Sequence, residues 1–80
     1  MKTIYKYTLD EPVRMPKGAT VVQVGIQDGL YCIWAVVDTD APLVERRFVV
    51  VGTGRELNNN MIHVGTVFEN PFVWHIMEAV

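Results

Sequence analysis

The sequence contains no serine and only one cysteine, Cys32, among its 80 residues. The lack of serine excludes a G-x-S-x-G nucleophile motif, and a lone cysteine cannot form an intramolecular disulfide. A single cysteine within an apolar segment is typically a buried, unreactive thiol. The two histidines, His63 and His75, lack the spacing of a metal-binding motif, so we expect neither a metal nor a cofactor. These absences favour a protein that binds over an enzyme.

Net charge and long apolar runs are also scarce. Nine acidic and seven basic residues give a net charge of −2. A polynucleotide-binding surface normally has an excess of basic residues, so we expect no DNA or RNA partner. No apolar run approaches the ~18 residues of a membrane span, and the N-terminus lacks the apolar core of a signal peptide. The sequence therefore predicts no membrane association and a cytoplasmic location.

The length allows one domain, which we place at residues 1–80. Hydrophobic residues make up 50% of the chain, which excludes a disordered tail. A single core is marginal at this size, and small domains often depend on a disulfide, a metal or a partner subunit. Because the first two are not expected here, the sequence predicts a homo-oligomer.

Short β segments separated by turn residues dominate the pattern. Within Thr20–Gln27 the apolar residues Val22 and Val24 alternate with other residues, which is the period of a strand. The dipeptide Asp28-Gly29 predicts a two-residue hairpin turn that leads into Leu30–Asp38. Both faces of that second segment are apolar, so we expect a central strand that is covered on both sides.

The other expected strands lie on either side of this hairpin. They are Lys2–Thr8, Arg46–Val51, Ile62–Phe68 and Phe72–Met77, with a short extended piece at Val13–Met15. No window of ten residues shows a helical period, and Arg55–Asn58 makes at most one helical turn. Regularly spaced short strands predict a mainly β fold, a small barrel or sandwich of five to six antiparallel strands.

One candidate site is the glycine-rich segment that follows Val51. Gly52, Thr53 and Gly54 allow backbone N–H groups to converge into an anion-binding concavity, and Arg55 adds a bidentate clamp for a phosphate. The segment matches neither a P-loop nor a dinucleotide fingerprint. A flexible hairpin loop, with glycine for turn geometry, is the ordinary explanation of the same residues.

A second candidate site lies near the C-terminus, where Trp74 and His75 fall on opposite faces of a strand. Trp74 fits a core position, although a tryptophan at a pocket wall also stacks on a base. His75 then lines a groove or a subunit interface, or is an ordinary structural histidine. Arg46 and Arg47 are adjacent and point to opposite faces, so one of them needs a partner, a ligand or a solvated edge.

Several strings give the chain a family resemblance over nearly its whole length. They are Met15-Pro16-Lys17-Gly18-Ala19, Trp34-Ala35-Val36-Val37-Asp38, Val51-Gly52-Thr53-Gly54 and Phe72-Val73-Trp74-His75. On these strings the chain resembles a family of small uncharacterised proteins encoded by tailed phages and prophages. The family implies no catalytic or binding residues, but small acidic β-rich phage proteins are often accessory factors against host defence.

Three functional hypotheses follow. The first is a phage counter-defence protein that sequesters a nucleotide immune signal, of the cyclic oligonucleotide or ADP-ribose type, without cleaving it. Its candidate ligand-binding residues are Arg47, Gly52, Thr53, Gly54, Arg55, Trp74 and His75. The alternative is a phage accessory protein that binds a host or phage protein through a β edge or an apolar face. The third is a small phosphodiesterase, which requires His63, His75 and Glu56 to converge.

Overall fold

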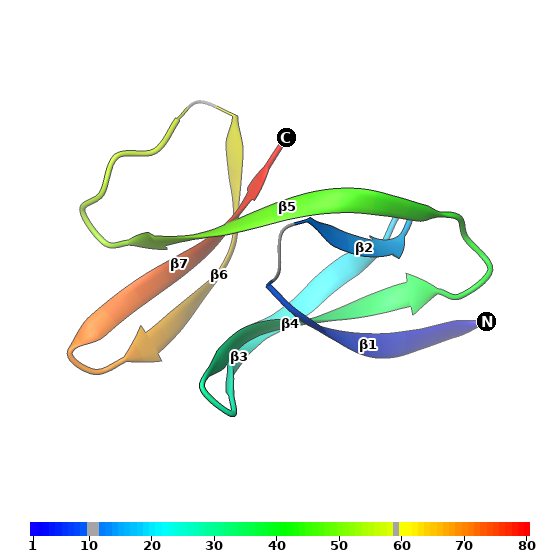
Figure 1. Cartoon of the computed structure of the whole chain (residues 1–80), viewed down its shortest axis with the longest axis horizontal. Coiled ribbons are helices and arrows are strands. Elements are labelled where there is room, and N and C mark those ends of the chain that lie inside the picture. The colour runs from blue at the N-terminus through cyan, green and yellow to red at the C-terminus, as the bar shows by residue number, and fades with distance from the viewer. Residues whose placement is uncertain (10–11, 59) are drawn as a thin grey trace.

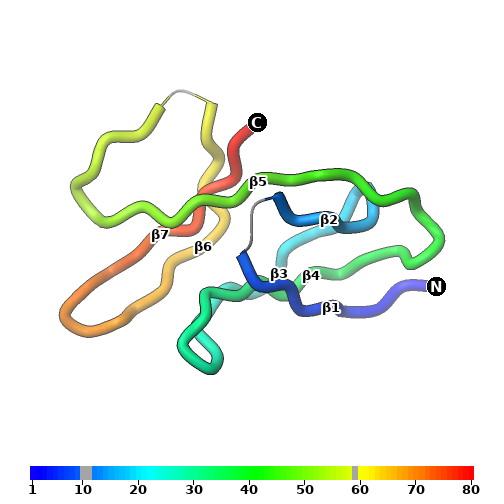
Figure 2. The backbone as a smooth tube through the Cα atoms, viewed as in Figure 1, coloured from blue at the N-terminus to red at the C-terminus, as the bar shows by residue number. Residues whose placement is uncertain are grey.

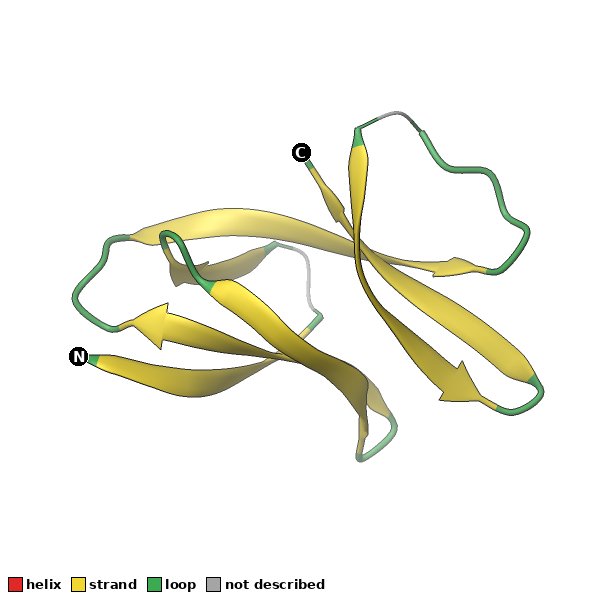
Figure 3. Ribbon diagram, turned by 180° about the vertical axis from the view of Figure 1, so that it is seen from behind, coloured by secondary structure: helices red, strands yellow, loops and turns green. Residues whose placement is uncertain are grey.

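Seven antiparallel strands form the protein, seen here as a computed structural model that describes residues 1–9, 12–58 and 60–80 (Figures 1 and 3). The strands are β1 (Lys2–Thr8), β2 (Val13–Pro16), β3 (Thr20–Gln27), β4 (Leu30–Asp38), β5 (Leu43–Gly52), β6 (Met61–Glu69) and β7 (Phe72–Ala79). Arg55–Asn58, where the sequence allowed at most one helical turn, has no helical structure. Within the described ranges no helix has the length and apolar character needed to cross a membrane.

Two sheets face each other and are not closed into a barrel, so the sandwich form of the expected all-β fold is the one observed. The first sheet has the order β1-β4-β3, and the second has the order β2-β5-β7-β6. Figure 2 shows β5 running along the molecule from β2 to β7. The strand count exceeds five to six because Val13–Pro16 pairs in full with Leu43–Arg46. The same pairing makes β5 start at Leu43 and not at Arg46.

The hairpin between β3 and β4 is confirmed at the predicted turn. Asp28 has a φ of 54° and Gly29 a φ of 78°, the left-handed values that a two-residue type I′ turn requires. The central position of β4 is also confirmed, because β1 and β3 pair with its two edges. Its coverage on both sides is only partial, since Ile33 lies in the core while Leu30 on the other face is exposed.

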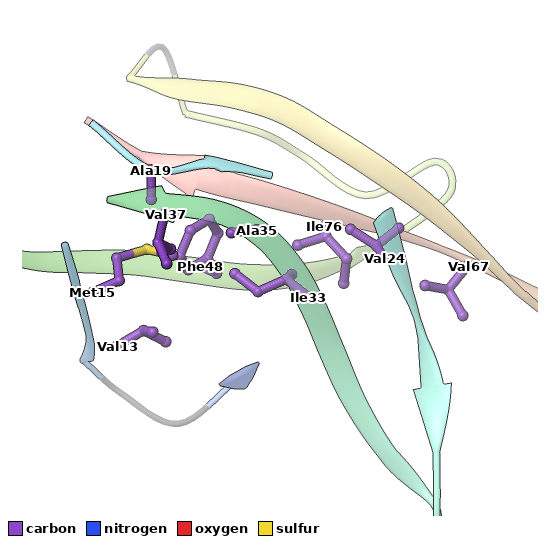
Figure 4. Packing of buried hydrophobic residues seen from close by; sticks show 10 residues of the cluster. All are labelled: Val13, Met15, Ala19, Val24, Ile33, Ala35, Val37, Phe48, Val67 and Ile76. Atoms are coloured by element: carbon purple, nitrogen blue, oxygen red, sulfur yellow. The ribbon is translucent and has the colours of Figure 1, made fainter. Parts of the chain in front are cut away.

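The core fills the space between the two sheets (Figure 4). It consists of apolar side chains from β2 to β7 and the β2–β3 turn: Val13, Met15, Ala19, Val24, Ile33, Ala35, Val37, Phe48, Val67 and Ile76. Cys32 is buried and free, as the sequence predicts, on the other face of β4. Within the described residues no polar or charged residue is classed as buried, so apolar packing joins the sheets.

Two β-bulges change which side chains face the core. In β3 the register shifts between Val21 and Gln23, so the extra residue Val22 is 51% exposed while Val21 packs against the core. The prediction that Val22 shares a face with Val24 is therefore wrong. In β6 the register shifts between His63 and Gly65. An extra residue in one strand reverses the alternation beyond it, which re-aims the side chains that follow.

Candidate functional site

The face of the second sheet that is turned away from the core carries the two histidines. Opposite residues on neighbouring antiparallel strands share a face, and His75 of β7 lies opposite Thr66 of β6. Met77 lies opposite His63 in the same sheet. Residues 63 and 66 would normally point to opposite faces, but the bulge at Val64 places both beside His75.

A tight turn follows β5 at the edge of this face. The Arg55 N–H donates to the Gly52 carbonyl over 3.1 Å, and Gly54 has a φ of 87°, as the third position of a type II turn requires. The Thr53 N–H donates to the Val73 carbonyl over 3.2 Å. The amides of Thr53 and Arg55 are therefore already used, and the expected concavity of free backbone donors does not include them. The Arg55 side chain remains as the cationic group of this turn.

A cavity of about 280 Å³ lies between the β5–β6 connection and this face of the sheet. The candidates Gly52, Thr53, Gly54, Arg55 and His75 all line it. Four further residues line it that were not among the candidate ligand-binding residues: Val51 in β5, Leu57 in the connection, His63 in β6 and Met77 in β7. The fold thus brings together five of the seven candidates from two segments about 20 residues apart.

The two imidazoles that line the cavity contact each other and Thr66, which is not one of its lining residues. His63 Nε2 lies 3.3 Å from His75 Nδ1, and Thr66 Oγ1 lies 3.3 Å from each of these nitrogens. On the other side of its ring, His75 Nε2 lies 2.9 Å from Thr53 Oγ1. The Thr53 hydroxyl donates its single hydrogen to the Val73 carbonyl over 3.2 Å. With its hydrogen given to Val73, this hydroxyl accepts from His75 Nε2–H, and in that tautomer the Nδ1 lone pair of a neutral His75 faces the other two groups.

A second hollow of about 380 Å³ adjoins the first and shares Gly52, Thr53 and Arg55 with it. Its other wall carries Phe72 and Trp74, whose rings are stacked with centroids 5.5 Å apart and planes 26° from parallel. Gly52 lies where the two hollows meet, and a Cβ there would be 3.2 Å from the Trp74 ring, which would have to shift by a few tenths of an ångström. Trp74 is half-buried and also packs against the core.

Trp74 is held in place by a carboxylate at the end of β6. The indole N–H donates to Glu69 over 2.9 Å, and the Tyr31 hydroxyl reaches the same Glu69 oxygen over 3.1 Å. Partial burial, together with the hydrogen bond to this carboxylate, raises the pKa of Tyr31 above its usual value. Glu69 therefore ties the stacked aromatic pair of the second sheet to β4 of the first.

Of the adjacent arginines, Arg46 has a structural role. It forms a two-point contact with Glu78, with Nε–Oε2 2.6 Å and Nη2–Oε1 2.8 Å, and also donates to the Ala19 carbonyl. The hydrogen bonds to Glu78 raise the pKa of Arg46. Arg47 lies opposite Ala79 in the sheet and does not line either hollow, so the structure does not bring this candidate to the others.

Arg55 differs from Arg46 in its surroundings. Its exposed side chain forms no ion pair with any residue in the described ranges. Glu56 lines neither hollow, so of the three groups that a phosphodiesterase was expected to need, only His63 and His75 converge. The arrangement offers one free guanidinium, two imidazoles and an aromatic pair around a single turn.

The comparison with protein families matches the whole chain. A family described as "Domain of unknown function (DUF7352)" covers residues 1–80. The chain belongs to this family. No curated protein and no solved structure matches the chain. This assignment agrees with the sequence resemblance to a family of small uncharacterised proteins. The family description names no activity, so the function has to be argued from the site.

Proposed function

We propose that the protein binds a small phosphorylated nucleotide in the two adjoining hollows and holds it intact. The position of Arg55 supports this proposal most directly, because its guanidinium borders both hollows and has no carboxylate partner among the described residues. Guanidinium groups bind phosphate oxygens through two parallel hydrogen bonds. An arginine without a protein partner is thus suited to an anionic ligand.

The aromatic wall supports a nucleotide over a simple anion. Phe72 is exposed and stacked on Trp74, which gives a flat apolar surface next to the arginine. Bases stack on such side chains, with a contribution of roughly 1–3 kcal/mol per base. The hollows measure about 280 and 380 Å³, and small-molecule sites commonly span ~300–1,000 Å³. We expect the base beside Phe72 and the phosphate beside Arg55.

A binding role is preferred to hydrolysis because no carboxylate of residues 1–9, 12–58 and 60–80 lines either hollow. Glu56 borders neither hollow, and the imidazoles of His63 and His75 face each other and Thr66. In the cell, we propose that the bound nucleotide is an immune signal of the cyclic oligonucleotide or ADP-ribose type. Sequestering it would serve phage counter-defence, the setting that the sequence resemblance implies, and a homo-oligomer would complete the walls of the hollows.

A protein partner is the second candidate, and it has its own observation. β6 is an edge strand, and it carries two exposed apolar side chains, Ile62 at 56% and Phe68 at 78% exposure. An unpaired edge with exposed apolar residues accepts an added strand from another chain. A stable complex with a host or phage protein, with no nucleotide retained, would favour this function.

The test compares two arginines that differ in location. Affinities for cyclic mono-, di- and trinucleotides and for ADP-ribose would be measured by calorimetry for the wild type, Arg55→Ala and Arg14→Ala. Loss of a charged hydrogen bond costs ~1.5–3 kcal/mol, so Arg55→Ala should weaken binding at least ~10-fold. Arg14 lines neither hollow, and its ion pair within the described residues is an exposed 3.8 Å contact with Glu45, so its removal should leave affinity unchanged. Equal losses in both variants would contradict the proposed location.

A further inference from the structure

Three atoms, one from each of the two cavity-lining histidines and one from the adjoining Thr66, form a nearly regular triangle. The distances from His63 Nε2 to His75 Nδ1, from His63 Nε2 to Thr66 Oγ1, and from His75 Nδ1 to Thr66 Oγ1 are all 3.3 Å. Each is longer than the usual ~2.8–3.0 Å of a hydrogen bond. Three equal separations of this length bring two ring nitrogens and one hydroxyl oxygen close enough to bind the same small ion.

The size of the triangle matches one face of a zinc coordination tetrahedron. The edge of a regular tetrahedron is about 1.6 times the centre-to-corner distance, so edges of 3.3 Å correspond to metal–ligand distances of ~2.0 Å. Bonds from Zn²⁺ to histidine nitrogen are ~2.0–2.1 Å. An octahedral face with the same edges would need ~2.3 Å, which is longer than zinc–imidazole bonds.

The surroundings of His75 fit a metal ligand as well. In the tautomer in which His75 Nε2–H donates to Thr53, the Nδ1 lone pair is the free one and belongs to the triangle. Metal-bound histidines usually donate their other ring N–H to a neighbouring acceptor, which fixes the tautomer and the ring orientation. Thr53 provides that acceptor, and it is itself held by the Val73 carbonyl.

We propose that His63, His75 and the Thr66 hydroxyl form a site for a divalent first-row transition ion of the Zn²⁺ type. In the described part of the chain no group of three or more His, Cys, Asp or Glu side chains gathers for a metal. The proposed site is built from two imidazoles and a neutral oxygen, and both imidazoles also line the 280 Å³ cavity. Imidazole ligands favour zinc, copper, nickel and iron over magnesium or calcium.

The spacing of the histidines along the chain gives no sign of this site, since residues 63 and 75 lie on separate strands. The bulge at Val64 creates it, because without the extra residue Thr66 and His63 would point to opposite faces. The inference rests on the triangle and is independent of nucleotide binding. An ion held by the two cavity-lining imidazoles would nevertheless give a phosphate oxygen a second partner beside Arg55.

The test uses Zn²⁺ alone, on protein with no affinity tag and no nucleotide. His63 and His75 are the only histidines, so ring ¹⁵N NMR spectra contain four imidazole resonances in all. We expect Zn²⁺ to shift His63 Nε2 and His75 Nδ1 in slow or intermediate exchange. Ring resonances that do not change at saturating Zn²⁺ would overturn the proposal, even if every histidine variant failed to fold.

Variants then distinguish the proposed metal ligands, His63 and His75, from Thr53, which holds the ring of His75. His63→Gln and His75→Gln should each weaken Zn²⁺ at least ~10-fold, and Thr53→Val should weaken it while also changing the tautomer signature of His75. Asp40→Asn is the matched control, because Asp40 lies 3.0 Å from the N-terminal amine at a separate acidic cluster. Unchanged Zn²⁺ affinity in the histidine variants, or a loss only in Asp40→Asn, would place the ion elsewhere and overturn the proposal.

Discussion

Gly65 controls how closely the two sheets approach, and its replacement is the sharpest test of the fold. A Cβ at Gly65 would lie 2.5 Å from Val24 Cγ2, 3.0 Å from Val24 Cγ1 and 3.3 Å from Val24 Cβ. Val24 is a core residue on β3 of the opposite sheet. Because both methyl groups and the branch carbon are too close, rotating the stiff valine side chain does not relieve the contact.

We expect Gly65→Ala to destabilise the protein by about 2–3 kcal/mol, the upper part of the ~1–3 kcal/mol range for overpacked cores. In a domain of this size 1 kcal/mol lowers Tm by ~4–8 °C, so the loss should be at least about 8 °C. Thermal and denaturant unfolding measure it. The effect reaches the site too, since Gly65 directly follows the bulge that aligns His63 with Thr66.

Two further variants isolate the cause. Val24→Ala removes the two closest atoms, so the double variant should be less destabilised than the sum of the single losses by at least ~1 kcal/mol. Gly25→Ala is the control, because its Cβ would meet only the Trp34 ring at 3.6 Å, an ordinary contact, and its loss should stay below ~1 kcal/mol. A wild-type Tm for Gly65→Ala, or additive losses in the double variant, would refute this account of the sheet packing.

Two other predictions concern charges. Glu78→Ala should destabilise the protein by about 2–4 kcal/mol, because it leaves the Arg46 guanidinium without its carboxylate in a site where both side chains are about four-fifths buried. Glu45→Ala removes the partner of Arg14 in an exposed pair and should change the stability by less than ~0.5 kcal/mol. Equal losses of stability in chemical denaturation would contradict the structural role of Arg46. Glu69→Gln should lower the pKa of Tyr31, because it removes the carboxylate that, together with partial burial, raises it. Because the pKa of Tyr31 is raised in the folded state, its contact with Glu69 contributes its full stabilisation of the fold below the usual tyrosine pKa of ~10. That contribution is lost as the pH rises through the pKa of Tyr31 in the folded protein. Tyrosine ring NMR titrations of the two proteins measure this, and identical titration curves would show that Glu69 has no influence.

Local signals in the sequence were enough for the fold class and much of the site. Asp28-Gly29 requires left-handed backbone that few dipeptides adopt, and it forms the predicted turn. The two apolar faces of Leu30–Asp38 correctly indicated a central strand. The alternation around Trp74 and His75 correctly placed them on opposite faces of β7, with Trp74 against the core.

The remaining features depend on pairing between distant strands, which period-two patterns do not contain. An extra residue at Val22 or Val64 is invisible in sequence because each segment still alternates locally, yet it reverses every face beyond it. Thr66 was missed for this reason. The amides of Thr53 and Arg55 looked free in the sequence, but one pairs with the next strand and the other closes its own turn.

The proposed function makes its most direct claim about what the protein retains. Purified protein would be mixed with cyclic mono-, di- and trinucleotides and ADP-ribose derivatives, washed, and denatured by heat, and the released molecules identified by mass. The account predicts that a nucleotide is retained by the wild type, is released with unchanged mass, and is not retained by Arg55→Ala. Retention of no member of the panel, or release of a cleaved product, would contradict it.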